Sequence, residues 1–491
     1  MNLDAGLLSP VTVGHDRVTD AAVVDALVTA EVGLARAYGE VGLAPKDAVD
    51  AIADATGWDA TERLCRGHGV DAAELAAASV AGGNPVIPLV GMLRRKVPES
   101  ARIWVHRGAT SQDILDTALM IVARRAVRQV RSGLDEIESA LGAFAGAHRD
   151  EVGAARTLTQ HAVPTTVGLR AAAWLRGIRR AKDRLDRLTL PAQLGGAGGT
   201  LASFTEIAAR GLDAPETGPA LHERWGADAS PATLTRALVS QFASEVTLTA
   251  PEAPWHTTRW PVTELGDALV ATIDAVGVVA ADVATLSRTE IGELAEGTGG
   301  GSSAMPQKQN PTASVLIRSA ALRAPQLAAT LHLASALAVD ERPDGAWHAE
   351  WPTLRELLRL ASGSTATAAG LVARLRVDHD AVARNVRLTR GLVVAERISL
   401  VLGPVIGADA VARIVAEVAS GGDLADAVRA EIASTDAAGI DVEALVDPAQ
   451  YTGLGGELVD EALGRPAAIP VGRDSTPEQT TSHATPEEEV P

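Results

Sequence analysis

Residues 115–144, LDTALMIVARRAVRQVRSGLDEIESALGAF, decide the fold. Apolar side chains recur through this stretch at steps of three and four residues: Leu115, Leu119, Val122, Ala126, Val130, Leu134, Ile137, Leu141 and Phe144. This spacing places one apolar stripe along a single helix. At about thirty residues the helix is far longer than the globular average of about 11 to 12, and such length is typical of bundles. The chain is therefore predicted to be all-α, with a central bundle of long helices.

Four further stretches have helical character, and each follows a proline, which is tolerated in a first helical turn because its missing N–H has no partner there. They are residues 167–188, 262–291, 313–339 and 354–375, after Pro164, Pro261, Pro311 and Pro352. We expect a central bundle domain at 106–375, between helical domains at 1–105 and 376–464. No alternating pattern is long enough to build a sheet. Residues 465–491 are rich in Pro, Thr, Ser and Glu and are predicted to form a disordered tail.

The composition of the chain excludes several classes of function. The 491 residues carry a net charge of -18, whereas nucleic-acid binding needs concentrated positive charge. Cys65 is the single cysteine, so no internal disulfide or multi-thiolate zinc site can form, and a cytoplasmic location is expected. No stretch approaches about 18 uninterrupted apolar residues, and the first residues lack a secretory pattern, so no membrane partner is expected.

The first segment that interrupts the helical pattern of apolar residues is HRGATSQDILDTA at residues 106–118. In one interpretation it is only a helix N-terminus, with Thr110 or Ser111 as the cap and Asp113 in the first turn. In the other, the free backbone N–H groups and hydroxyls at this helix start also bind an anion such as a carboxylate. The residues alone leave both interpretations open.

The second segment is TLTQHAVPTT at residues 157–166, which again precedes a helix. The polar groups of Thr159 and Gln160 would form hydrogen bonds within a turn, or they would donate hydrogen bonds to a ligand. His161, taken alone, is more often a hydrogen-bonded structural histidine than a catalyst. Its role stays open.

The third segment is GTGGGSSAMPQKQNP at residues 297–311. A flexible linker is one interpretation, but linkers rarely run directly into Met, Lys, Asn and Pro before a helix. It is not a phosphate-binding P-loop, because the Gly-Lys-Ser/Thr ending is missing. A glycine loop can instead close over a site, which would bring Ser302 or Ser303 near Lys308 and the following helix N-terminus. Such an arrangement stabilises developing negative charge.

These three segments, in this order, resemble the active-site segments of the fumarase/aspartase superfamily, and GSSAMPQKQNP resembles its signature loop. The resemblance covers roughly residues 10–465. Within the superfamily, four segments are similar to the 3-carboxymuconate cycloisomerase branch: ATSQDILDTALM at 109–120, LPAQLGGAGGTLAS at 190–203, APWHTTRW at 253–260 and GAWHAEW at 345–351.

The resemblance implies a three-domain, all-α fold and a homotetramer in which each active site is built from three chains. It implies no metal and no organic cofactor, and a small tricarboxylate as the substrate. By position, Ser302 is the expected proton-transfer residue. Lys308, the second expected catalytic residue, would hold with Asn310 the substrate carboxylate that takes up negative charge. A serine hydroxyl is a weak acid and base, so its oxyanion needs backbone N–H groups and nearby positive charge. The implied substrate-binding residues are His106, Thr110, Ser111, Thr159, Gln160, Asn310 and Arg342.

The sequence departs from the superfamily at Leu158, where lyases typically carry a histidine that assists the departing group. An aliphatic side chain cannot move a proton. In a cycloisomerisation the added group is the substrate's own carboxylate, already ionised near neutral pH. The loss therefore fits conversion of 3-carboxy-cis,cis-muconate to 4-carboxymuconolactone better than it fits a fumarase. His161 is the residue that would substitute for the missing histidine.

Two alternatives remain at this stage. The first is a C–N lyase of the adenylosuccinate type. That branch carries phosphate-binding serines and an arginine in the stretch where this chain has Trp347, His348 and Trp351, which argues against this alternative. Simple helix packing and a substrate-shaping role explain these tryptophans equally well. The second alternative is a non-catalytic structural relative, although Ser302 and Lys308 are both present.

Overall fold

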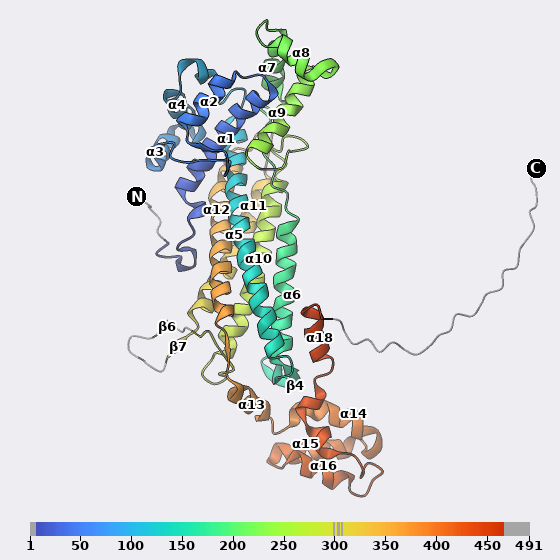
Figure 1. Cartoon of the computed structure of the whole chain (residues 1–491). Coiled ribbons are helices and arrows are strands. Elements are labelled where there is room, and N and C mark those ends of the chain that lie inside the picture. Colours follow the sequence, from blue (N-terminus) through green and yellow to red (C-terminus); the bar gives the residue numbers. More distant parts are fainter. Residues whose placement is uncertain (1–5, 298–299, 302–304, 306–307, 466–491) are drawn as a thin grey trace, which may run out of the picture.

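The computed structural model describes residues 6–297, 300–301, 305 and 308–465. Its centre is a bundle of long helices that run side by side along the longest dimension of the molecule (Figure 1). These helices are α5 (Ser111–Ala147), α6 (Val167–Asp186), α10 (Trp260–Leu286), α11 (Thr312–Ala336) and α12 (Gly345–Ala373). The predicted all-α architecture with a central long-helix bundle is confirmed.

Helix α5 has the apolar stripe that its sequence predicts. Every residue of the ladder from Leu115 to Leu141 is buried, and Phe144 is partly buried against the same core. The helix is 37 residues long, so it extends beyond the ladder at both ends. Its neighbours α6 and α12 pack against it, and burial of the stripe supplies the stability that helix propensity alone does not.

The predicted start of one bundle helix is wrong. Helix α12 begins at Gly345 and contains Pro352 in its interior, whereas the sequence predicted a start after that proline. A proline removes a single backbone hydrogen bond. Trp347 and Glu350, which precede it, are both buried, so packing of the first two turns outweighs the lost bond. Helix α6 begins at its predicted residue, Val167, and α11 begins one residue before its predicted start. Helix α10 begins at Trp260, two residues before its predicted start, so Pro261 lies in its first turn.

Shorter helices cover the two ends of the bundle (Figure 1). One end holds α1 (Asp20–Val41), α2 (Lys46–Ala55), α3 (Ala72–Gly82), α4 (Val86–Lys96), α7 (Ala202–Asp213), α8 (Gly218–Trp225) and α9 (Pro231–Glu245). The other end holds α13 (His379–Arg387), α14 (Ala395–Ile406), α15 (Ala408–Ser420), α16 (Leu424–Ile432) and α17 (Val442–Val446), while α18 (Gly455–Ala462) packs against α6. The 3-10 helices are Pro10–Thr12, Asp16–Val18, Glu99–Trp104, Gly226–Asp228, Leu392–Val394 and Pro448–Tyr451.

Two apolar cores underlie this arrangement. The larger core joins the bundle to the helices at the α1 end, and a second, smaller core lies among α13 to α17. The second core supports the proposed boundary near residue 375, because nearly all of its residues follow that position. The proposed boundary at residue 105 lies within the larger core, and the division of the chain at 105, 375 and 464 remains a proposal. The predicted tail lies outside the described residues apart from Arg465.

Strands occur in the described part of the chain only as short antiparallel pairs. They are β1 (Trp58–Asp59) with β2 (Leu64–Cys65), β3 (Val152–Thr157) with β4 (Gln160–Thr166), β5 (Leu294–Ala295) with β8 (Arg376–Val377), and β6 (Gly300–Gly301) with β7 (Gln309–Asn310). The expectation of no extended sheet is met within these residues. The β3–β4 hairpin was not predicted, and it carries the second sequence motif.

Helix α10 has the length and apolar composition of a membrane-spanning helix, with a mean hydropathy of 1.9 over its most apolar window. Half of that window is buried inside the molecule, where α10 packs against α6, α11 and α12. A bundle helix enclosed by other helices is apolar for that reason alone. This single helix is weak evidence for a membrane.

Candidate active site

The sequence motifs lie at opposite ends of the bundle. Residues 106–110 precede α5, which begins at Ser111, and the β3–β4 hairpin follows it (Figure 1). Because α5 has 37 residues and rises about 1.5 Å per residue, its two ends are about 55 Å apart. The β6–β7 pair lies at the hairpin end, and Lys308 directly precedes β7 in the chain. Within one chain, the proposed substrate-binding residues therefore lie in two distant groups.

At the first end, Thr110 is the N-cap of α5. Its backbone N–H donates to Asp113 Oδ2 at 3.0 Å within a capping box, and Ser111 is the first helical residue. Arg342, from the connection between α11 and α12, donates to the Thr110 hydroxyl and to the Ala197 carbonyl at 3.2 Å. Thr110, Ser111 and Arg342 are thus grouped at one helix start. The predicted cap at Thr110 is confirmed. The guanidinium beside the cap supplies the positive charge that an anion site needs, and anion binding here remains a prediction.

His106 lies just before this cap, in a left-handed backbone conformation with φ 60°. Its Nδ1 is 2.7 Å from Glu31 Oε1 on α1, and Glu31 is almost fully buried. Burial disfavours the charged ring, but the Glu31 carboxylate more than offsets this and raises the pKa of His106 above its usual value. Much of the positive charge on His106 is therefore balanced by Glu31 before any substrate binds.

This pair predicts a pH-dependent contribution to stability. A histidine with a raised folded-state pKa stabilises fully below its unfolded pKa of about 6.5, and the gain is lost as pH rises through the folded pKa. We therefore expect His106→Gln to lower Tm more at pH 6 than at pH 9, and Glu31→Gln to remove the same pH-dependent component. Thermal denaturation at the two pH values measures this. An equal decrease at both would contradict the ion pair.

Asp113 is a fully buried hub, not only a favourable first-turn residue. Its carboxylate accepts from the backbone N–H groups of Thr110, Gly195 and Gly196 at 2.8 to 3.0 Å, and lies 3.0 Å from His256 Nε2. One side chain thus ties the start of α5 to the glycine loop at 190–203 and to the segment before α10. Asp113 fixes the backbone on which Thr110 stands.

One turn further along α5, a buried ionic cluster joins three of the segments that resemble the cycloisomerase branch. Arg259 donates to Asp116 Oδ2 at 2.7 Å and to Glu350 Oε2 at 2.5 Å, and the three side chains are 0 to 1% exposed. Trp347 Nε1 donates to Asp116 Oδ1 at 2.8 Å. The Trp347 ring is therefore explained by packing and by this hydrogen bond. The cluster positions the starts of α5, α10 and α12 beneath the Thr110 cap.

At the other end, Thr157 pairs with Gln160, which leaves a two-residue loop of Leu158 and Thr159. Both loop residues have positive φ, 49° and 73°. A loop of this kind is normally built from Asn and Gly, because other residues are strained there. Leu158 is 96% exposed, and Thr159 and Gln160 are exposed beside it. The hairpin thus holds a large apolar side chain and two polar ones outward at its tip.

His161 lies opposite Arg156 across the hairpin. Arg156 forms a bidentate ion pair with the buried Glu293, in which Arg156 Nη1 donates to Glu293 Oε2 at 3.1 Å. Burial and the neighbouring Arg156 lower the pKa of His161, against a smaller opposing effect of Glu293. A neutral ring at this position can accept a proton at neutral pH. The catalytic role of His161 remains a prediction.

The third segment is described only in part. Ser302 and Ser303 lie outside the described residues, Lys308 is exposed, and Asn310 is half-buried in β7, opposite Gly300. Among the contacts of the residues that the structure does describe, none joins Lys308 or Asn310 to Thr159 or Gln160. The roles of Ser302, Lys308 and Asn310 therefore rest on the motif.

Some residues that shape this region were not singled out from the sequence. They are Glu31, Asp116, His256, Arg259 and Glu350. A signal was available, because opposite charges stand within otherwise apolar segments, and buried charges are almost always paired. Their pairing partners, however, are far away in the sequence.

The chain is similar over most of its length to known lyases and cycloisomerases. A model of the lyase family matches residues 15–214 and 225–325, more than half of the chain. Nitrosuccinate lyase from Streptomyces davaonensis is 42% identical over 487 residues, which span 95% of this chain and 96% of the relative. 3-Carboxy-cis,cis-muconate cycloisomerase from Pseudomonas aeruginosa is 36% identical over 454 residues, 89% of this chain and 91% of the relative.

A solved structure agrees with these relatives. The crystal structure of 3-carboxy-cis,cis-muconate lactonizing enzyme from Pseudomonas putida matches with a TM-score of 0.78 and 32% identity, over 94% of this chain and 98% of that one. The chain belongs to the lyase family of the fumarase/aspartase superfamily, as its three motifs predict. The fumarase-like fold is confirmed as well. The relatives differ in their reactions, since one is named for a lyase activity and others for cycloisomerisation.

Proposed function

We propose that this protein is a cytoplasmic cycloisomerase that converts 3-carboxy-cis,cis-muconate to 4-carboxymuconolactone. The observation that carries the proposal is Leu158, an aliphatic residue at the outward tip of the β3–β4 hairpin, where many lyases of the superfamily carry a proton-donating histidine. An aliphatic tip suits a reaction in which the group added to or lost from carbon is a stable anion. A substrate carboxylate is such a group.

In the proposed reaction one substrate carboxylate forms a C–O bond to its own double bond. Ser302 delivers a proton to the adjacent carbon, so the product is an isomer and no atom is lost. Attack within one molecule removes much of the entropic barrier, which leaves positioning as the main task of the protein. Lys308 and Asn310 hold the carboxylate that takes up negative charge in the transition state.

The charges of the proposed site fit a tricarboxylate. Arg342 supplies a cationic donor at the α5 start, where His106 adds an imidazole whose charge Glu31 largely balances. Lys308 supplies a second cationic donor at the hairpin end. Thr110, Thr159 and the other hydroxyl and amide groups add neutral donors. Three carboxylates need several convergent donors of this kind, because a buried charge without partners is costly.

The proposed site is shared between copies in a homotetramer. The distance of about 55 Å along α5 separates the Thr110 group from the hairpin, so residues of both groups reach one substrate only from different chains. The exposed Leu158 fits insertion into a second copy. Val315, Leu322 and Leu333 form an exposed apolar row along α11, which a neighbouring bundle would cover.

A second candidate is the elimination of nitrite from nitrosuccinate, which would leave fumarate. The 42% identity to nitrosuccinate lyase favours it. Nitrite, like a carboxylate, is a stable anion near neutral pH, so Leu158 is compatible with this reaction too. An adenylosuccinate-type lyase fits less well, because Trp347 and Glu350 in the comparable stretch are buried in the Arg259 cluster.

Two assays on the purified protein separate these candidates. Loss of the conjugated ultraviolet absorbance of 3-carboxy-cis,cis-muconate is the expected result. Release of nitrite and fumarate from nitrosuccinate, without turnover of the muconate, would replace the proposal with the second candidate. Turnover of neither substrate would favour a non-catalytic relative.

A further inference from the structure

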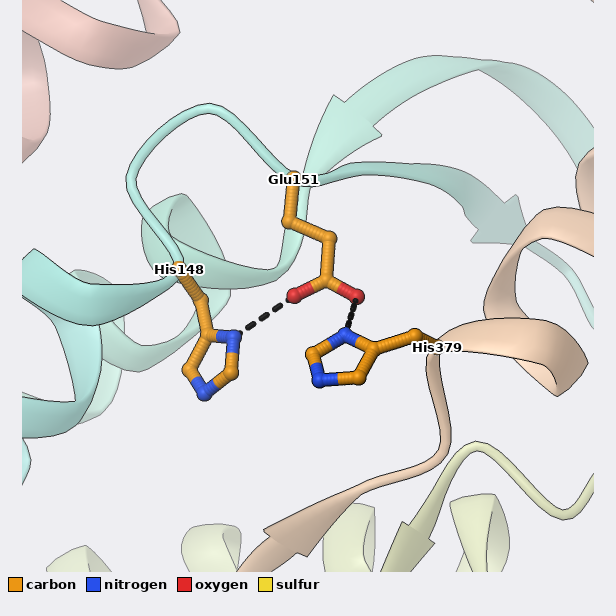
Figure 2. Close-up of side chains that lie close together, drawn as sticks. All are labelled: His148, Glu151 and His379. Carbon is orange, nitrogen blue, oxygen red and sulfur yellow. Dashed lines mark hydrogen bonds and ion pairs between the residues drawn. The ribbon is translucent and has the colours of Figure 1, made fainter.

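Three side chains that no sequence motif contains converge at the hairpin end of the bundle. His148 is the C-cap of α5, Glu151 directly precedes β3, and His379 is the first residue of α13. Figure 2 shows both imidazole rings directed at the same carboxylate. His148 Nδ1 lies 2.6 Å from Glu151 Oε2, and His379 Nδ1 lies 2.6 Å from Glu151 Oε1. Candidate ligand atoms from the three residues all lie within 4.8 Å of one another.

The donor set has a defined chemical preference. Two imidazole nitrogens and one carboxylate oxygen are typical ligands of Zn²⁺ and of related divalent transition metals, whereas Ca²⁺ and Mg²⁺ prefer oxygen alone. The His148 and Glu151 side chains are 17% and 20% exposed, and that of His379 is 70% exposed. The first two are therefore held in place by their surroundings, and the third faces solvent, from which an ion would enter.

The electrostatic surroundings favour a cation. Glu151 contacts His379, and Asp378 and Asp380 flank His379 in the sequence, so three carboxylates lie close to this imidazole. The His148 ring is itself supported by Phe144, with the ring centroids 4.5 Å apart. A fixed imidazole, a fixed carboxylate and a surplus of negative charge form a partly pre-organised site.

We propose that His148, Glu151 and His379 bind one divalent transition-metal ion, with Zn²⁺ the expected ion. The metal takes the place of the proton that each Nδ1 now donates to the carboxylate. Each metal-bound ring then carries one proton on Nε2, any additional proton passes to solvent, and a water molecule completes a tetrahedral set. Bonds of about 2.0 to 2.1 Å in a tetrahedron place ligand atoms about 3.4 Å apart. The two N–O contacts of 2.6 Å would therefore lengthen, and ligand atoms that are now up to 4.8 Å apart would move closer together.

The proposed ion has a structural role. It would fasten α13, which packs against β3, to the base of the hairpin that holds Thr159 and Gln160 at its tip. His379 stands 228 positions after Glu151, so the ion would cross-link distant parts of the chain. No step of the proposed reaction involves it, and its presence does not depend on which substrate the protein uses.

Calorimetric titration of the full-length, chelator-treated protein with ZnCl₂ tests the site. We expect one Zn²⁺ per chain, a rise in Tm on saturation, and affinity at least about tenfold weaker in His379→Ala and in Glu151→Gln. Co²⁺ in place of Zn²⁺ should give the visible absorption of a tetrahedral complex, which both variants should lose.

His332→Ala is the matched control. His332 also contacts a carboxylate, Asp267, at 3.0 Å, but no second imidazole among the described residues joins it in a three-ligand group. Its zinc affinity should equal that of the wild type. Circular dichroism establishes that each variant is folded. Absence of stoichiometric Zn²⁺ binding by the wild type, or equal affinity in His379→Ala and the wild type, would overturn the proposal. Neither readout depends on catalytic turnover.

Discussion

Replacing Arg259 by methionine is expected to destabilise the fold by about 3 to 5 kcal/mol, the cost of breaking a buried ion pair. Arg259 is fully buried between Asp116 and Glu350 and stacks on Trp255, 4.8 Å from the ring centroid. Burial alone would lower the pKa of Arg259, but the two carboxylates more than offset this and hold the pKa above its usual value. Without the guanidinium, two buried carboxylates lose their counter-charge. Urea denaturation followed by circular dichroism measures the loss.

Arg413→Met is the matched control for this experiment. Arg413 also makes a two-pronged ion pair, with Glu431 at 2.7 and 2.8 Å, but its side chain is 62% exposed. The same substitution there should cost less than about 1 kcal/mol, as is usual for exposed pairs. Similar losses in the two variants would mean that the buried cluster does not support the α5 end of the bundle.

Replacing Ser302 by alanine is expected to lower kcat by at least about a hundredfold, the scale lost when a proton-transfer or oxyanion group is removed. The reason is chemical, because alanine can neither donate the proton nor carry the negative charge. Loss of the muconate absorbance over time gives kcat. The variant should keep the wild-type melting temperature, since the change removes one hydroxyl from a glycine-rich loop.

Ser303→Ala is the control for Ser302, because it removes the same group from the next residue of the loop. Its kcat should remain within a few-fold of the wild type. If Ser302→Ala keeps near-normal turnover, or if Ser303→Ala is the more damaging change, then the assignment of the proton-transfer residue is wrong.

The helices could be predicted from the sequence because their signal is local. The ladder from Leu115 to Phe144 sets both the existence and the buried face of α5. The cap at Thr110 could be predicted for the same reason, since capping chemistry involves residues three positions apart. Local patterns were insufficient at Pro352, where burial of Trp347 and Glu350 carries the helix through a residue that normally ends it.

The interactions between distant segments could not be predicted in this way. Arg259 binds Asp116 across 143 positions of the chain, and His379 reaches Glu151 across 228. No spacing rule links such residues, and the histidine spacings accordingly predicted no metal site. The β3–β4 hairpin was not predicted because its two-residue turn lacks the usual Asn and Gly. Leu158 and Thr159 adopt the positive φ angles that those residues favour.

The central structural claim is that opposite ends of the bundle, from different copies, form one active site. It is tested most directly by mixing two variants that we expect to be inactive, Arg342→Ala at the Thr110 end and Ser302→Ala in the glycine-rich third segment, and measuring turnover after the subunits exchange. Sites that combine an intact Ser302 from one chain with an intact Arg342 from another should restore up to about a quarter of wild-type turnover. A mixture that exchanges subunits and stays as inactive as its parents would contradict the claim.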